Sequence, residues 1–303
     1  MSRILVIKLA ALGDFVQAFG PFAAIRAHHP GAHITLLTTP PFAPLAEASP
    51  WFNEVWRDGR PDWLDLRAVA RLAMRLRRAG FARVYDLQTS SRSSRYRLFV
   101  GGGTEWSGIA RGASHPDADP RRDFLHTAER QRGQLQAAGI THFPAPGLDW
   151  LDADVSAFAL PPGFALLLPG ASPTRPGKRW PAAHFAALAA RLGRPVVLWG
   201  GPADIPLARE IAALTPGLLD LTGRTDLRQL AAVARRAAMA IGNDSGPTHL
   251  AAAAGCPTLA LFGTESDPAL CAPRGQVVVL RHEPLAALGV EAVLQAASGL
   301  AGG

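Results

Sequence analysis

The chain has 303 residues, 48% of them hydrophobic, which is ordinary for a globular protein and predicts two domains of about 150 residues each. Two cysteines cannot form a disulfide framework, no apolar run approaches the ~20 residues of a transmembrane helix, and no secretory signal precedes the first expected strand, so we expect a cytoplasmic protein. The net charge of +7 is carried mostly by arginine, and it is compatible with a nucleic acid, an anionic membrane surface, an anionic substrate or simply an arginine-rich composition.

Short β-branched runs alternate with amphipathic stretches, which is the pattern of βαβ units on parallel sheets. In the first half we expect strands at residues 4–8, 33–38, 54–56, 84–87 and 104–109. The expected helices there cover residues 14–28, 42–48, 63–79, a stretch from Ser91, and 124–138.

The second half repeats the alternation after a linker expected at residues 152–162. Its expected strands are 165–168, 196–199, 218–221, 238–241, 258–262 and 277–280, with helices at 182–192, 205–214, 227–236, 247–254 and 284–297. We therefore predict a doubly wound domain over residues 1–155, a second over 156–283, and a C-terminal segment, 284–303, whose helix packs back on the N-terminal domain. Ligands are expected at the carboxyl ends of the strands, in a cleft between the two domains.

The first chemical motif is the turn Lys-Leu-Ala-Ala-Leu-Gly-Asp at residues 8–14, between the first strand and the first helix. Gly13 permits a tight turn and places Asp14 at or beside the helix N-terminus. The turn is not the dinucleotide fingerprint GxGxxG. On this residue alone, an N-cap is the simpler interpretation of Asp14. The alternative is a general base at the strand end, kept ionised by the helix dipole.

The second motif follows the strand at residues 165–168 and reads Pro-Gly-Ala-Ser, then Lys-Arg-Trp-Pro at 178–181. The turn at Ser172 offers backbone N–H groups, and Arg175 and Lys178 add positive charge. These features suit a diphosphate, although a solvated basic loop is the alternative.

The third motif is Gly-Asn-Asp-Ser-Gly-Pro-Thr-His at residues 242–249, where a strand passes into a helix. Ser245, Gly246 and Thr248 surround a helix N-terminus that would bind phosphate. Asp244 is positioned to accept hydrogen bonds from sugar hydroxyls. His249 is a weaker candidate, because a histidine on a helix more often serves packing.

Three weaker signals involve aspartates. Asp204 follows a strand and two glycines, and it suits either a ribose hydroxyl pair or the cap of the next helix. The pairs Asp117/Asp119 and Asp152/Asp154 have the spacing of a metal-binding DxD, but they lie away from strand ends and we interpret them as solvated.

Residues 8–14, 178–181 and 243–250, together with the strand at 84–88 and the Ser-Arg segment after it, resemble family 9 glycosyltransferases, the lipopolysaccharide heptosyltransferases. The resemblance covers nearly the whole chain, and residues 243–249 are its most specific part. It implies a GT-B fold with the acceptor on the N-terminal half and ADP-heptose on the C-terminal half.

The resemblance also implies roles for single residues. Asp14 matches the proposed base, Lys178 the phosphate-binding lysine and Asp244 the sugar-binding acid. Ser245, Gly246 and Thr248 match the diphosphate loop, and Asp204 matches a ribose contact. Pro173 and Pro176 depart from the commoner forms of this loop, which leaves the donor sugar open.

The sequence therefore predicts an inverting glycosyltransferase that uses a nucleotide-sugar co-substrate and neither a metal nor another cofactor, because Lys178, Arg175 and a helix N-terminus supply the positive charge. The expected partners are the donor and an anionic glycolipid or glycan acceptor, with transient contact at the inner face of the plasma membrane; we expect a monomer and no nucleic acid. The alternatives are a non-catalytic sugar-nucleotide-binding protein, a nucleic-acid-binding protein and a GT-B-fold sugar-nucleotide epimerase.

Overall fold

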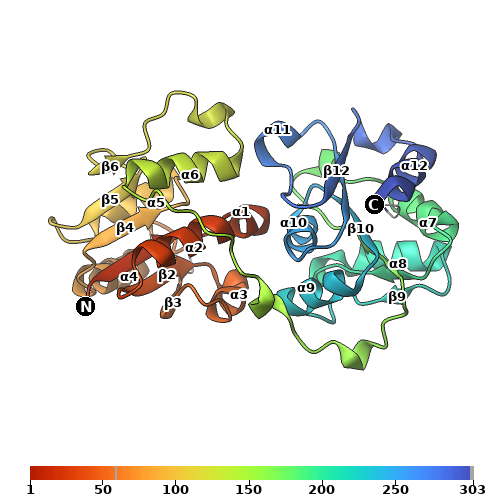
Figure 1. Cartoon of the computed structure of the whole chain (residues 1–303), viewed down its shortest axis with the longest axis horizontal. Helices are drawn as coiled ribbons and strands as arrows, with labels where there is room; N and C mark the ends of the chain where they lie inside the picture. Colours follow the sequence, from red (N-terminus) through yellow and green to blue (C-terminus); the bar gives the residue numbers. More distant parts are fainter. Residues whose placement is uncertain (59, 301–303) are drawn as a thin grey trace. The chain divides into compact units, whose positions relative to one another are not determined.

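The computed structural model describes residues 1–58 and 60–300, and it divides into two compact units, Met1–Trp150 and Leu151–Gly303. Within the described residues, each unit contains one six-stranded sheet in which every neighbouring pair of strands is parallel (Figure 1). The prediction of two doubly wound α/β sheets is therefore confirmed.

The first unit has the strand order β3-β2-β1-β4-β5-β6. Its strands are β1 (Arg3–Ile7), β2 (His33–Thr38), β3 (Glu54–Arg57), β4 (Arg83–Asp86), β5 (Glu105–Gly108) and β6 (His115–Pro116). Its helices are α1 (Leu12–Gln17), α2 (Phe19–His28), α3 (Ala43–Glu47), α4 (Leu66–Arg78), α5 (Ser91–Arg95) and α6 (Thr127–Ala137).

The second unit has the order β12-β11-β10-β7-β8-β9. Its strands are β7 (Ala165–Leu168), β8 (Val196–Leu198), β9 (Leu219–Asp220), β10 (Met239–Asn243), β11 (Thr258–Phe262) and β12 (Val277–Arg281). Its helices are α7 (Ala182–Arg191), α8 (Ile205–Leu214), α9 (Leu227–Arg236), α10 (Gly246–Ala253), α11 (Pro268–Cys271) and α12 (Val290–Leu300). Short 3₁₀ turns lie at Pro40–Phe42, Tyr96–Leu98, Arg122–Phe124, Asp149–Leu151, Ser156–Phe158, Pro176–Lys178, Pro202–Asp204 and Leu285–Ala287.

The expected single helix over residues 14–28 is wrong, because the chain forms two helices that meet at Ala18. Pro21 has no N–H to donate to the carbonyl four residues earlier, so the hydrogen-bond ladder cannot run through this point. The first helix is consequently a short, separate element, and it holds Asp14 close to the end of β1.

The C-terminal helix also differs from the prediction. The buried residues of α12, Val293, Ala297 and Leu300, lie in the hydrophobic core of the second unit, where the helix packs on α7, β10 and β11. The apolar stripe of α12 is thus covered by its own unit. The division of the chain falls at residue 150, five residues before the predicted boundary.

Both sheets have central strands that are buried along almost their whole length, as parallel strands covered by helices require. Among the described residues, no helix combines the length and the apolar character needed to cross a bilayer.

The strand order reverses once in each sheet, between β1 and β4 in the first unit and between β7 and β10 in the second. At such a switch point the two neighbouring connections leave the sheet in opposite directions, and a crevice opens at the carboxyl ends of the strands. The loops that follow these four strands therefore contain the candidate binding sites.

Candidate active site

Asp14 is the third residue of α1 and is half-buried. Ala11, not Asp14, occupies the N-cap, so the simple N-cap interpretation is wrong. The Asp14 carboxylate instead reaches back to the Ala11 backbone N–H, with an Oδ2–N distance of 3.3 Å. This position places the carboxylate beside the positive end of the helix dipole.

The loop before Asp14 is held in place by side chains from three other segments. Gln88 Oε1 accepts hydrogen bonds from the N–H groups of Leu9 (2.8 Å) and Ala10 (3.0 Å). The Leu9 carbonyl accepts from Thr39 Oγ1 at 2.7 Å and from Arg60 Nη2 at 2.9 Å. The backbone before Asp14 is therefore held by the loops that follow β2, β3 and β4.

Asp14 opens into a cavity of about 330 Å³ within the first unit. Two arginines, Arg60 and Arg92, line the same cavity together with Gln88 and Ser90. Arg92 also donates to the Pro61 carbonyl at 3.1 Å and lies over the Trp63 ring at 4.9 Å, which orients its guanidinium. A cavity with one carboxylate and two guanidinium groups suits a polar, negatively charged ligand that presents a hydroxyl to Asp14.

Two buried charged groups lie near Asp14. Lys8 is 3% exposed and donates to the Leu87 carbonyl at 3.1 Å. Burial lowers the pKa of Lys8, while the charges of Asp14 and Asp86 act in the opposite direction. Asp86 is fully buried, and its Oδ1 accepts from the N–H groups of Gln88 and Thr89. Burial raises the pKa of Asp86 to about 7, against the lowering influence of Ser93, these N–H groups and Lys8.

In the second unit the predicted residues Lys178, Asp244 and His249 come together. Lys178 Nζ lies 2.5 Å from Asp244 Oδ2, which also accepts from Ser266 Oγ at 2.6 Å. His249 Nε2 lies 3.6 Å from Asp244 Oδ1. Burial raises the pKa of Asp244, but hydrogen bonds from His249, Lys178 and Ser266 outweigh burial and hold it at about 2. Asp244 is thus a permanent carboxylate with a lysine beside it.

The N-terminus of α10 lies directly after Asp244. Ser245 is its N-cap residue, and Gly246 begins the helix, so the first N–H groups have no carbonyl within the helix to bond. Thr248 Oγ1 donates to the Asn243 carbonyl at 2.7 Å and lies 3.3 Å from Ser245 Oγ. The Thr248 side chain lies so close to the backbone of residue 242 that this position needs glycine, since a Cβ there would lie 2.5 Å from Thr248 Oγ1.

The loop after β7 is joined to the same place. Asn243 accepts from the Trp180 N–H at 3.1 Å and donates to the Pro169 carbonyl at 2.7 Å, so both ends of the loop are tied to β10. Glu265, in the loop after β11, accepts from the Gly177 N–H at 2.9 Å. The loops after β7, β10 and β11 therefore meet at one edge of the sheet and position Lys178.

Ser172 and Arg175 lie on the exposed part of this loop. Ser172 Oγ is 2.9 Å from Thr174 Oγ1, and the Arg175 side chain makes no hydrogen bond or ion pair to any residue of 1–58 or 60–300. Neither residue contacts Asp244, so their assignment to a diphosphate remains a prediction.

The Asp204 side chain does not cap α8 itself, but it caps the 3₁₀ turn Pro202–Asp204 that leads into this helix. Its Oδ2 accepts from the Gly201 N–H at 2.9 Å, and a Cβ at Gly170 would lie 2.6 Å from it. Asp204 thus adjoins the start of the loop after β7, and its assignment to a ribose contact stays a prediction.

The DxD-like pairs are bound to arginine. Asp117 is buried and lies 2.8 Å from Arg122, contrary to the expectation that it is solvated, and Asp152 lies 3.1 Å from Arg236. In the part of the chain that the structure describes, no three His, Cys, Asp or Glu side chains gather as a metal site would require.

Sequence reasoning missed Arg60, Ser266 and Glu265, and it gave no role to Lys8. Arg60 and Glu265 are charged residues in loops without a motif, and their partners are far away in sequence. Lys8 is the first residue of the turn at residues 8–14, and the signal available in the sequence was a charged side chain between two apolar stretches.

Comparison with known proteins gives one family. The sequence profile of "Glycosyltransferase family 9 (heptosyltransferase)" matches residues 69–285. The chain is 29% identical over 294 residues to lipopolysaccharide heptosyltransferase 2 of Salmonella typhimurium, covering 87% of this chain and 83% of that protein.

Two solved structures are similar over nearly the whole chain. The family 9 glycosyl transferase of Veillonella parvula has a TM-score of 0.87 at 24% identity, covering 99% of this chain and 97% of the other. The E. coli ADP-heptose LPS heptosyltransferase II has a TM-score of 0.80 at 26% identity, covering 99% and 98%. The predicted GT-B type of fold is confirmed by these likenesses.

The buried Asp86 predicts a measurable pH dependence of stability. Its folded-state pKa is about 7, whereas an unfolded carboxyl titrates near ~4. Between these values the folded chain holds a proton that the unfolded chain has lost, so stability falls as the pH rises. Asp86→Asn should remove this loss, which amounts to roughly 2–3 kcal/mol between about pH 5 and pH 8.

Urea unfolding of both proteins at the two pH values measures the effect. Asp149→Asn, at an exposed carboxylate, is the matched control and should keep the wild-type pH dependence. An equal loss of stability in wild type and Asp86→Asn would show that Asp86 is ionised in the folded protein throughout.

Proposed function

Because the chain belongs to glycosyltransferase family 9, the heptosyltransferase family, we propose that it moves heptose from ADP-heptose to a lipopolysaccharide-core acceptor with inversion at the anomeric carbon. Its being a glycosyltransferase follows from the family itself. The choice of donor, acceptor and mechanism is supported by the two switch-point sites. In the first unit the Asp14 carboxylate lines a cavity, and in the second Lys178 lies beside the residues that begin α10. The similar E. coli protein is described as an ADP-heptose LPS heptosyltransferase, which supports the choice of donor and acceptor.

We assign the acceptor to the first unit. An inner-core glycolipid carries carboxylate and phosphate groups, and Arg60 and Arg92 line the cavity into which Asp14 opens. Guanidinium groups bind such anions through paired hydrogen bonds. With an anionic group held by these arginines, an acceptor hydroxyl is directed to the Asp14 carboxylate.

We assign the donor to the second unit. The diphosphate is placed at the N-terminus of α10, where Gly246 and Thr248 offer N–H groups, with Lys178 and Arg175 as cations. Asp204 suits the ribose hydroxyls. In the structure Lys178 is engaged by Asp244, so we infer an exchange in which Lys178 turns to the diphosphate and Asp244 Oδ2 accepts a sugar hydroxyl instead.

This exchange explains how two buried charges are kept in the free protein. An unpaired carboxylate at this depth would be costly, and the ion pair with Lys178 removes the cost until the donor arrives. Ser266 and His249 remain as hydrogen-bond partners of Asp244 after the lysine leaves.

The reaction then needs no covalent intermediate. Asp14 takes the proton of the acceptor hydroxyl while that oxygen bonds to the anomeric carbon, and the bond from this carbon to the ADP oxygen breaks on the opposite face. Negative charge grows on the diphosphate and is stabilised by Lys178, Arg175 and the α10 N-terminus. We place the enzyme in the cytoplasm, at the inner face of the membrane that carries the lipid-linked acceptor.

Replacement of Asp14 by Asn tests the base directly. Asn keeps the size and the acceptor for the Ala11 N–H, so the melting temperature should hardly change. It cannot take a proton at neutral pH, so turnover should fall about 10²–10⁴-fold. Donor affinity should stay close to wild type, because the proposed donor site lies in the other unit.

The measurements are melting temperature, ADP-heptose affinity and ADP release in the presence of acceptor. Asp62→Asn, an exposed carboxylate outside the cavity, serves as control and should be fully active. Wild-type turnover in Asp14→Asn would refute the assignment of the base.

The charge supplied by Lys178, Arg175 and α10 also predicts that the reaction proceeds without a divalent cation. The transfer rate in excess EDTA should equal the rate in Mg²⁺ or Mn²⁺, measured as ADP release. Loss of activity in EDTA that returns with one of these ions would show that a metal neutralises the diphosphate.

A further inference from the structure

Helix α4 has an unusual outward face. Leu72 and Leu76 point to the core of the first unit, and the opposite side follows the helical spacing i, i+4, i+7 and i+11. The residues at these positions are Arg67, Arg71, Met74 and Arg78, all exposed. We call these four residues the α4 stripe.

The charge of the α4 stripe is not neutralised within the protein. The helix carries five arginines and no acidic residue. Its N-cap is Asp65, and Arg75 lies 4.0 Å from Glu54 of β3. Arg67, Arg71 and Arg78 make no hydrogen bond or ion pair with any described residue. A solvated surface helix usually intersperses both signs of charge, so this arrangement indicates an anionic partner.

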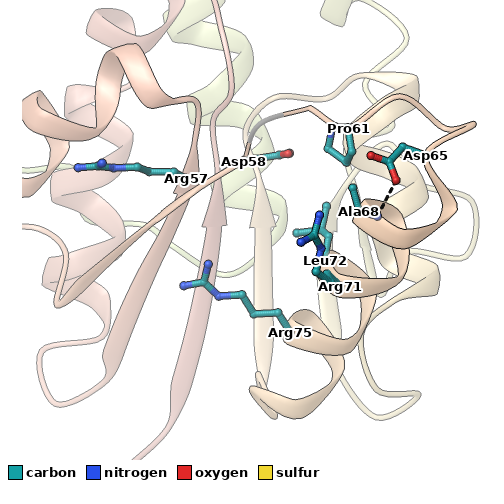
Figure 2. Close-up of a pocket in the computed structure, with 8 residues that line it drawn as sticks. All are labelled: Arg57, Asp58, Pro61, Asp65, Ala68, Arg71, Leu72 and Arg75. Carbon is teal, nitrogen blue, oxygen red and sulfur yellow. Dashed lines mark hydrogen bonds between the residues drawn. The ribbon is translucent and has the colours of Figure 1, made fainter.

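The arginines of α4 also enclose concave space. Arg71 and Arg75, on successive turns, line a cavity of about 400 Å³ with Pro61 and Asp65, as Figure 2 shows. Beside it, a second cavity of about 470 Å³ is lined by four arginines together with apolar side chains: Arg3, Arg71, Arg75 and Arg78, with Trp56, Met74 and Ala79. Arg3 and Arg75 each lie 4.0 Å from Glu54, whereas Arg71 and Arg78 form no ion pair with a described residue, so the cavity has a positive excess that matches a phosphate-bearing group.

Large apolar side chains accompany this charge. Leu64 is 87% exposed, Leu66 74% and Met74 48%, and all three lie on α4 or just before it. Nucleic acids gain little from exposed leucines, whereas a helix with a basic face and flanking apolar side chains suits the boundary between lipid headgroups and acyl chains.

We propose that α4, with Leu64 and Leu66, docks the protein on an anionic membrane, where the α4 stripe and the four-arginine cavity bind phosphate headgroups. The path to the catalytic cavity is short, because Pro61 lines the α4 cavity while its neighbour Arg60 lines the cavity of Asp14. A lipid-linked acceptor is thereby held by its membrane next to the base. The choice of a membrane as partner rests on the proposed acceptor, but docking is measured without either substrate.

The test is co-sedimentation of the full chain with vesicles containing about one-third phosphatidylglycerol, compared with pure phosphatidylcholine, at low and high salt. We expect binding to the anionic vesicles only, weakened by salt. The double variant Arg71→Glu/Arg78→Glu should reduce partitioning by at least about tenfold.

The matched control is Arg111→Glu/Arg209→Glu, which changes the net charge equally at exposed positions outside α4 and should bind like wild type. Leu64→Ser/Leu66→Ser should also weaken binding while leaving every charge in place. Melting temperatures verify folding, and transfer to a delipidated acceptor should be unchanged in all variants, which separates docking from catalysis.

Three outcomes would overturn the proposal. They are wild-type partitioning of Arg71→Glu/Arg78→Glu, an equal loss in the Arg111/Arg209 control, and tighter binding of duplex DNA than of vesicles through the same stripe. If docking fails while transfer activity is normal, the proposed function stands and only the surface assignment is wrong.

Discussion

A single reversal of strand order in each parallel sheet is the constraint on which the rest of this structure depends. Within each sheet all strands run in the same direction, so the functional loops of that unit leave from one edge of its own sheet. The reversal between β1 and β4 in the first sheet, and between β7 and β10 in the second, keeps that edge open. Gly242 shows that the chain is closely packed where β10 leads into α10, since the Cβ of any larger residue would collide with Thr248 and Leu168.

Buried charged side chains lie at both switch points. Lys178 and Asp244 neutralise each other in the second unit, and Lys8 lies under the influence of Asp14 and Asp86 in the first. Removing charged groups from water costs free energy, and the attraction within a buried ion pair roughly offsets that cost. Such a pair therefore adds little to the stability of the fold. We infer that the Lys178–Asp244 pair serves the chemistry, because it contains a cation and a carboxylate that a bound substrate can separate.

Local patterns in the sequence predicted the parallel sheets, the positions of the loops after β1, β7 and β10, and the family. They failed where the outcome depends on partners far apart in the chain. The break at Ala18, the packing of α12 on its own unit and the hold of Gln88 and Arg60 on the loop before Asp14 all depend on tertiary contacts. The Lys178–Asp244 pair joins two residues that were each assigned a ligand, and only the fold shows that they first bind each other.

The division of labour between the two switch points is the central claim, and hydrogen–deuterium exchange read by mass spectrometry tests it most directly. Adding ADP-heptose to the protein should slow exchange in residues 170–180 and 243–249 and leave residues 9–14 and 88–92 unchanged. Adding the acceptor alone should slow exchange in the second pair of segments. Protection of residues 9–14 and 88–92 by ADP-heptose, with none in residues 170–180 and 243–249, would contradict the account.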